Sequence, residues 1–354
     1  MTAMVESSTP APRRPAHEPA GPAASRQTNG RWPQRRAYAA LDLGTNNCRL
    51  LIAKPEGDGF VVVDAFSRIV RLGEGLAANG RLSDAAIERA IVALTICADK
   101  LKRRHVTLAR SVATEACRRA SNGPAFIDRV YRETGIVLDI ITAEEEARLA
   151  VIGCHTLLEP GDGQALIFDI GGGSTELVLV DTLEAAPKIL DWQSAPWGVV
   201  SLTESEPAIA DTREARLEAY GRMKARVAEA FAPIASRLPA EKLPDIRLLG
   251  TSGTVTTLAS LYLNLSSYDR SAIDGLIVPT QAMRDISERL SAMSMAERER
   301  QPCIGQERAD LVVAGCAILD VIIDIWPAAR LGVADRGIRE GILRLLMARD
   351  GTKA

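Results

Sequence analysis

Apolar and polar residues alternate along the chain in short blocks, and these blocks predict an α/β protein. From residue 38 an apolar run of six residues ends in Gly44 and three polar residues, and a second apolar run follows at residues 48–53. Two apolar runs separated by a polar, glycine-containing turn are typical of a β-hairpin. A third apolar run at residues 60–66 predicts another strand.

Further along, the apolar spacing lengthens to three or four residues, which predicts helices between strands. Ile87, Ile91 and Leu94 fall on one face of a helix that begins at Asp84. Thr142 is a candidate N-cap of a later helix, with Glu145 at the reciprocal capping-box position. We expect further strands at residues 107–113, 136–141, 165–170, 176–180 and 246–249, and further helices at residues 124–133, 211–236, 307–325 and 339–347.

The strongest feature is an internal repeat 127 residues apart. With Asp42 set over Asp169, Leu-Asp-Leu-Gly-Thr-Asn-Asn-Cys-Arg matches Phe-Asp-Ile-Gly-Gly-Gly-Ser-Thr-Glu without a gap. Each copy is an apolar strand that ends in Asp-x-Gly, a small polar turn and a returning strand. One repeat of such a unit indicates two similar domains rather than a solenoid.

The two turns have the chemistry of phosphate loops. Small residues allow backbone N–H groups to approach an anion, and Thr45, Ser174 and Thr175 add hydroxyl donors. An Asp at the end of each strand is suited to hold a divalent cation or its waters. The paired arrangement resembles the actin, Hsp70 and sugar kinase superfamily. That resemblance implies two ribonuclease H-like α/β domains, at residues 37–155 and 156–354, facing a central cleft.

A longer series of motifs resembles the exopolyphosphatase and guanosine pentaphosphate phosphatase (Ppx/GppA) family, in its short two-domain form. In chain order the motifs are Ala-Thr-Glu-Ala-Cys-Arg118, Ile-Thr-Ala-Glu-Glu-Glu-Ala-Arg148, Asp-Ile-Gly-Gly-Gly-Ser-Thr-Glu176, Gly-Thr-Ser-Gly-Thr254 and Asp335-Arg-Gly-Ile-Arg-Glu-Gly341. The resemblance covers about residues 37–348.

The resemblance implies a role for each matching residue. Glu146 would be the general base that accepts a proton from the attacking water. Asp169 and Glu176, with Asp42 in a milder role, would hold Mg²⁺ or another divalent cation. The phosphate-binding residues would be Thr45, Asn46, Asn47, Arg118, Gly171, Gly172, Gly173, Ser174, Thr175, Ser252 and Gly253. Phosphoryl transfer to water needs positioning and charge neutralisation, which this set supplies.

Composition narrows the remaining possibilities. The 354 residues carry 43 Lys and Arg against 45 Asp and Glu, but residues 1–36 are Pro- and Arg-rich with net charge +4, which predicts a disordered arm. The near-neutral balance gives no sign of nucleic-acid binding, and no apolar run approaches the length of a membrane span. The six cysteines lack zinc-site spacing, which favours reduced thiols in the cytoplasm. We also expect a homodimer.

The motifs leave the substrate open. Inorganic polyphosphate and guanosine pentaphosphate present the same terminal phosphoanhydride. An ATPase or phosphotransferase of the wider superfamily is a further alternative, as is a non-catalytic sensor, which Glu146, Asp169 and Glu176 argue against.

Overall fold

The computed structural model describes residues 36–351 except residues 58, 160, 162, 185–186 and 207–209, and the described residues belong to one compact unit. Apart from Arg36, the predicted arm lies outside the described residues. In the part of the chain that is described, no helix combines the length and the apolar character needed to cross a membrane.

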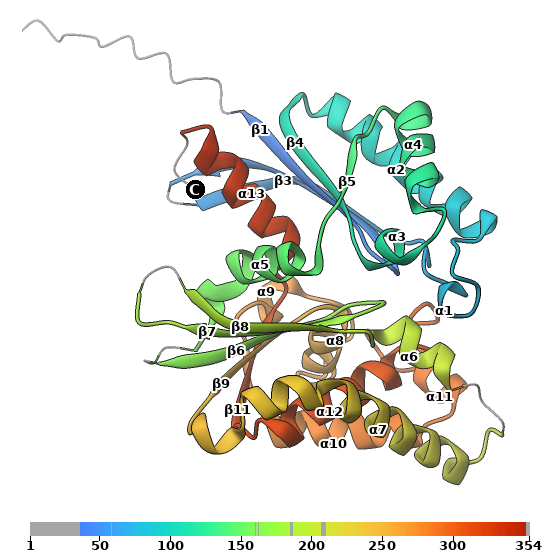
Figure 1. Cartoon of the computed structure of the whole chain (residues 1–354), viewed down its shortest axis with the longest axis vertical. Coiled ribbons are helices and arrows are strands. Elements are labelled where there is room, and N and C mark those ends of the chain that lie inside the picture. The colour runs from blue at the N-terminus through green and yellow to red at the C-terminus, as the bar shows by residue number, and fades with distance from the viewer. Residues whose placement is uncertain are drawn as a thin grey trace, which may run out of the picture. The chain divides into compact units, whose positions relative to one another are not determined.

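The first of the two described sheets contains the predicted N-terminal hairpin (Figure 1). Its order is β3-β2-β1-β4-β5; β1 pairs antiparallel with β2 and parallel with β4. The strands are β1 (Ala37–Leu43), β2 (Asn47–Glu56), β3 (Gly59–Ile69), β4 (Val106–Ala113) and β5 (Leu138–Ile140). Strand β1 is apolar on both faces because helices cover both sides of this sheet.

The second sheet repeats this topology. Its order is β10-β11-β9-β6-β7-β8, with β6 antiparallel to β7 and parallel to β9. The strands are β6 (Gln164–Ile170), β7 (Thr175–Asp181), β8 (Lys188–Ala195), β9 (Arg247–Thr251), β10 (Ile277–Pro279) and β11 (Arg330–Ala334). The run β8-β7-β6-β9-β11 corresponds to β3-β2-β1-β4-β5, so the repeat seen in the sequence is a repeat of sheet topology.

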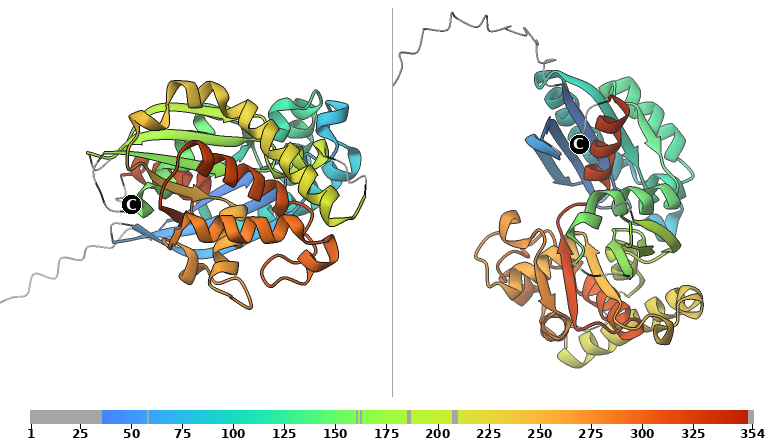
Figure 2. Two further views of the ribbon diagram at one scale, coloured as in Figure 1. Left: turned by 90° about the horizontal axis from the view of Figure 1, so that it is seen from below. Right: turned by 90° about the vertical axis from the view of Figure 1, so that its left-hand side faces the viewer.

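Helices surround both sheets (Figures 1 and 2). Those of the first half are α1 (Leu76–Asn79), α2 (Asp84–Arg103), α3 (Glu115–Arg119), α4 (Gly123–Thr134) and α5 (Ala143–Cys154), followed by the short η1 (His155–Leu157). Those of the second half are α6 (Val199–Ser205), α7 (Arg213–Arg237), η2 (Ala240–Lys242), α8 (Gly253–Tyr262), α9 (Arg270–Ile273), α10 (Thr280–Ala292), α11 (Met295–Glu299), α12 (Val312–Ile325) and α13 (Ile338–Arg349). Residues of α7, α10 and α12 share one apolar core with the second sheet.

Helix α5 lies between the two sheets (Figure 1), and its first turn carries Glu146, the predicted general base. Its Leu149 and Ala150 share a core with β1 and α13, whereas its Ala147 and Val151 share a core with β6 and β7. Helices α5 and α13 approach so closely that a Cβ on Gly341 would collide with the carbonyl of Leu149. Packing on both sides therefore fixes α5 with respect to both sheets.

Most predicted elements are confirmed, with limits. The helix expected at residues 307–325 begins only at Val312, because Arg308 to Leu311 form turns. Strands β8, β10 and β11 were not predicted. The division of the folded part after residue 155 stays a prediction. Helix α13 lies far beyond that point in the sequence, yet it packs against the first sheet (Figure 2, right).

Candidate active site

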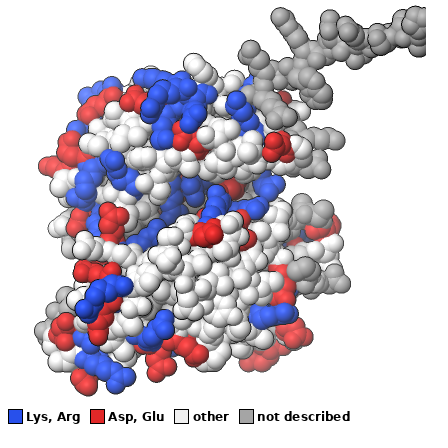
Figure 3. Space-filling view, turned by 180° about the vertical axis from the view of Figure 1, so that it is seen from behind, with Lys and Arg blue, Asp and Glu red and all other residues white. Residues whose placement is uncertain are grey.

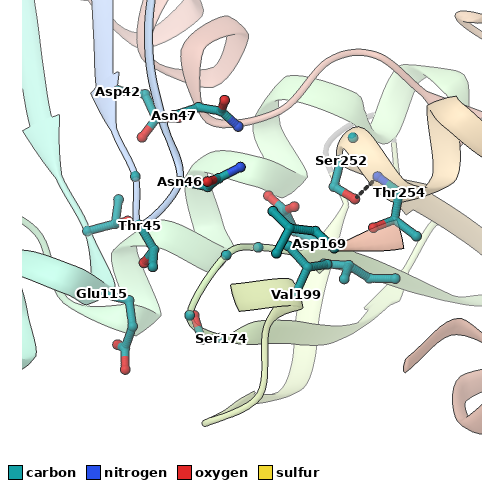
Figure 4. A pocket seen from close by; sticks show the side chains of 18 of the residues that line it. Asp42, Thr45, Asn46, Asn47, Glu115, Asp169, Ser174, Val199, Ser252 and Thr254 are labelled. Carbon is teal, nitrogen blue, oxygen red and sulfur yellow. Dashed lines mark hydrogen bonds between the residues drawn. The ribbon is translucent and has the colours of Figure 1, made fainter. Parts of the chain in front are cut away.

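The two repeated turns face each other and form the centre of one pocket (Figure 4). Each turn is closed in the same way: Gly44 N–H donates to the Asn47 carbonyl (2.9 Å) and Gly171 N–H to the Ser174 carbonyl (3.0 Å). The turns nearly touch, since a Cβ on Gly173 would lie 2.8 Å from Thr45 Oγ1. Only glycine permits this approach, so backbone N–H groups from two sheets are available to one anion.

The pocket brings together most of the residues expected to bind phosphate. The lining includes Thr45, Asn46, Asn47, Gly171, Gly172, Gly173, Ser174, Ser252 and Gly253. Ser252 caps α8, accepting from Thr254 N–H at 3.3 Å, and its φ of 111° turns the chain so that the helix begins at the pocket. The N-terminus of a ten-residue helix favours an anion.

Five carboxylates line the same pocket: Glu115, which pairs with Arg118 at 2.6 Å, and Asp42, Glu146, Asp169 and Glu176. Burial raises the pKa of Asp42 and raises that of Asp169 to about 6. Burial, then the charge of Asp169, raises the pKa of Glu176 to about 7, although Ser174 and Ser194 donate hydrogen bonds to its Oε1. A cluster of desolvated carboxylates is stabilised by a cation.

The carboxylates match a divalent cation in chemical type, because Mg²⁺ prefers oxygen ligands. Asp42 Oδ1 is buried with no hydrogen-bond partner among the described residues, as expected of an oxygen that would bind a cation. Yet in the described part of the chain no three acidic, His or Cys side chains are grouped closely enough to hold a metal as they lie. The predicted metal set of Asp42, Asp169 and Glu176 therefore stays a prediction.

Glu146 occupies the first turn of α5. Thr142 is confirmed as the N-cap, accepting from Glu145 N–H at 3.1 Å. The reciprocal half of the capping box was wrong: Glu145 accepts instead from Arg110, 2.6 Å away, because that cation lies beside it on β4. Glu144 is exposed, so of the three consecutive glutamates only Glu146 is buried in the pocket. Burial and then the charge of Glu176 raise the pKa of Glu146, whereas Arg118 lowers it.

Arg118 is not part of the pocket lining, but it contacts two carboxylates that are, Glu146 and Glu115. Its Nη1 donates to the Ile141 carbonyl (2.7 Å), and both Nη atoms lie 3.3 Å from Glu146 Oε2. Its Nη2 also donates to Glu115 Oε2 (2.6 Å). The phosphate contact implied by resemblance stays a prediction, since the terminal nitrogens already bind protein oxygens in this structure.

Thr175 is also absent from the pocket lining. Its hydroxyl is buried and donates to the Trp197 carbonyl at 2.7 Å. Side chains alternate along a strand, so Thr175 points away from the face that carries Glu176. Its role as a phosphate ligand stays a prediction without support from its orientation.

Sequence reasoning missed two arginines of the pocket. A Cβ on Gly253 would lie 3.7 Å from Arg308 Nη1 and 4.0 Å from Arg49 Nη2, so cations from both halves of the chain converge at the start of α8. The repeat contained a signal for Arg49, which pairs with Asp42 across the first hairpin as Glu176 pairs with Asp169 across the second. Arg308 lies in irregular structure and had no such signal.

Comparisons with known proteins point to one family. The model of the Ppx/GppA phosphatase family matches residues 51–349. The chain is 32% identical over 296 residues to exopolyphosphatase 2 of Mycobacterium tuberculosis, covering 80% of this chain and 88% of that protein. It is 29% identical over 310 residues to guanosine-5'-triphosphate,3'-diphosphate pyrophosphatase of Aeromonas salmonicida, covering 86% of this chain and 58% of that protein.

Solved structures agree with the fold. A Ppx/GppA family member of Aquifex aeolicus matches with a TM-score of 0.70 and 28% identity, covering 89% of this chain and 98% of that one. An exopolyphosphatase of Cytophaga hutchinsonii matches with a TM-score of 0.76 and 24% identity, covering 90% and 99%. The predicted α/β fold is thereby confirmed, with two sheets that repeat one topology.

Proposed function

Because the chain belongs to the Ppx/GppA phosphatase family, we propose that it is an exopolyphosphatase, which removes terminal orthophosphate from inorganic polyphosphate. The observation that carries this proposal is the burial of Glu146 beside two opposed phosphate loops in one pocket. The curated relative named exopolyphosphatase 2 supports the choice of substrate.

The terminal phosphate is held by the turn at residues 171–174 and by Thr45 and Asn46 opposite. Their backbone N–H groups and hydroxyls neutralise charge without adding a competing cation. Basic side chains gather in the hollow that crosses the face shown in Figure 3, and the pocket itself contributes Arg49 and Arg308. These cations suit the following phosphates of a chain.

Hydrolysis needs a water positioned for in-line attack. Glu146 accepts the proton of this water as its oxygen bonds to the terminal phosphorus, and the bond to the bridging oxygen breaks. The electron pair stays on the bridging oxygen of the shortened chain. Arg118 keeps enough of Glu146 ionised for this task, against the effects of burial and of Glu176.

The predicted cation would be held by Asp169 and Glu176, with Asp42 nearby. When bound, it neutralises phosphate oxygens and the charge that develops on the leaving oxygen. The raised pKa values of these carboxylates and the unpartnered Asp42 Oδ1 support this proposal.

A second candidate substrate is guanosine pentaphosphate. The Aeromonas relative is named for a nucleotide with phosphates at both the 5' and 3' positions. Arg49 and Arg308 converge at the start of α8, and this pair suits a second group of phosphates.

One assay tests these proposals together. Orthophosphate release is measured side by side on short polyphosphate, long polyphosphate, guanosine pentaphosphate and ATP, with Mg²⁺ and with a chelator. We expect polyphosphate hydrolysis that the chelator abolishes. Glu146→Gln removes most of the rate, whereas Glu144→Gln, on the exposed side of the same turn, retains it. Hydrolysis of ATP alone would instead support the superfamily ATPase.

A further inference from the structure

A second, smaller cavity lies directly behind the phosphate loops. Its lining comprises Thr45, Gly73, Leu76, Ala77, Glu115, Arg119, Gly173, Val200, Ser201 and Glu204. Three of these residues, Thr45, Glu115 and Gly173, also line the main pocket. These three residues therefore separate the two spaces at the point where the loops face each other.

The shared wall is at the end of the main pocket remote from α8. Figure 4 shows Thr45 and Glu115 on one side and Ser252 and Thr254 on the other. A chain that contacts Arg49 and Arg308 occupies the α8 side, so its terminal phosphate is the phosphate nearest the second cavity.

This placement has a consequence for product release, which rests on the proposed function. Once the terminal bond breaks, orthophosphate lies behind the shortened chain. The chain blocks the way out past α8 for as long as it stays bound. Repeated cleavage without dissociation therefore requires another opening.

The outer wall of the second cavity is built to move. Helix α1 contributes Leu76 and Ala77 and has only four residues, between Gly75 and Gly80, both left-handed with φ of 71° and 65°. Its first end is held to the second half of the chain by an exposed hydrogen bond, from Gly75 N–H to Glu204 Oε1 at 2.9 Å. Leu76 is its buried anchor. Ser121 N–H and Oγ both donate to the Gly80 carbonyl and hold the second end. The glycine pivots therefore allow the first end, held to Glu204 by one exposed hydrogen bond, to swing away from it.

The charged residues of the second cavity are Arg119 and two carboxylates, Glu115 and Glu204, and each carboxylate already accepts from a protein donor. Glu115, in the shared wall, is neutralised on its inner side by Arg118 at 2.6 Å and faces Arg119 at 3.7 Å on its outer side. Arg119 lines the second cavity with 42% of its side chain exposed. Phosphate passing outward moves past Glu115, which Arg118 pairs, towards the guanidinium of Arg119.

We propose that orthophosphate leaves the enzyme through the cavity beneath α1, which opens when the Gly75–Glu204 hydrogen bond breaks, while the polyphosphate chain stays in the main pocket. The cavity has room for about one water molecule when closed, with a volume of about 10 Å³. Opening of α1 is thus required for each phosphate released.

The test is the length distribution of partly digested long polyphosphate. Ala77 and Ala78 are both exposed on α1, but only Ala77 lines the cavity. We expect wild type and Ala78→Trp to give full-length chains and orthophosphate early in the reaction. Ala77→Trp blocks the exit and gives a ladder of intermediate lengths, with a several-fold drop in phosphates removed per binding event. Hydrolysis of a one-turnover substrate changes little.

A second, independent pair of variants changes the charge at Ala77 rather than its bulk, and both new side chains remain on the exposed face of α1. Ala77→Glu repels the leaving anion and gives the ladder, more strongly at low salt, whereas Ala77→Lys stays processive. If all Ala77 variants give the wild-type pattern, or if wild type itself gives a ladder, the exit proposal is overturned while the exopolyphosphatase proposal stands. If wild type releases no orthophosphate from polyphosphate, the proposed function fails and the exit proposal falls with it.

Discussion

Replacing Arg118 by methionine distinguishes two roles for this arginine. The resemblance to the family implies that Arg118 binds phosphate, whereas the geometry indicates that it holds the charge of Glu146. Methionine keeps much of the buried aliphatic stem and removes the cation. The matched control is Arg119→Met, which removes a half-exposed cation one position along the same helix.

The expected magnitude follows from the separation. Unit charges 3.3 Å apart, as in the Arg118–Glu146 pair, attract by about 5 kcal/mol at an effective dielectric constant of about 20. Arg118 is 23% exposed, so solvent screens part of this attraction. About 1.4 kcal/mol, roughly a quarter of it, raises the pKa of Glu146 by about one unit. We therefore expect kcat to fall about tenfold at pH values where Glu146 is mostly protonated.

The pH profile gives the decisive readout. Loss of Arg118 raises the pKa of Glu146 further, because burial and the charge of Glu176 are then unopposed. A base with a raised pKa is ionised only at higher pH, so the acid limb of kcat moves to higher pH and activity recovers under alkaline conditions. A raised KM with an unshifted acid limb would refute this reasoning and restore the phosphate-binding role. Arg119→Met leaves the limb in place.

Two further predictions concern stability, measured by urea unfolding. The hydrogen bonds from Lys100 and Arg104 lower the pKa of Asp64 to about 2, so the bridge stabilises the fold above pH 3.8 and the stability is lost as the pH falls through about 2. Asp64→Asn should cost about 1 kcal/mol at pH 7 and clearly less at pH 2, where about half of the Asp64 carboxyls are protonated in the folded state; an equal loss at both would contradict this. Gly153→Ala forces a methyl group against the Gly337 carbonyl, where α5 meets the start of α13, and should cost about 1–3 kcal/mol. Gly221→Ala, in open space on α7, should instead stabilise by up to about 1 kcal/mol, and equal effects would disprove the close-approach argument.

Local sequence patterns predicted the two hairpins and the pocket between them because the strand, the Asp-x-Gly turn and the returning strand occur twice in the chain. Aligning Asp42 with Asp169 was sufficient to expect two loops facing one anion. Strand alternation, applied more strictly, would also have included Arg49 and excluded Thr175, since residues opposite the two aspartates share their face. The signal was present in the sequence for both residues.

Other features depend on contacts between distant segments. Whether Arg118 turns to phosphate or to Glu146 is decided by Ile141 and Glu115, which only the fold places beside it. Arg308 reaches the pocket from a turn with no periodic pattern. The docking of α13 on the first sheet joins residues about 300 positions apart, and no sequence window contains both partners.

The cross-strand exchange of Arg49 for Glu176 makes the two halves of the pocket electrically unlike. Two copies of the first half would place Arg49 opposite a second Arg49 and would lack the pair of acids formed by Asp169 and Glu176. A symmetric pair of second halves would bring four carboxylates together with no guanidinium from the hairpins. Neither half could build this site by self-association. The site therefore needs two unlike copies of the repeat, and this chain supplies both.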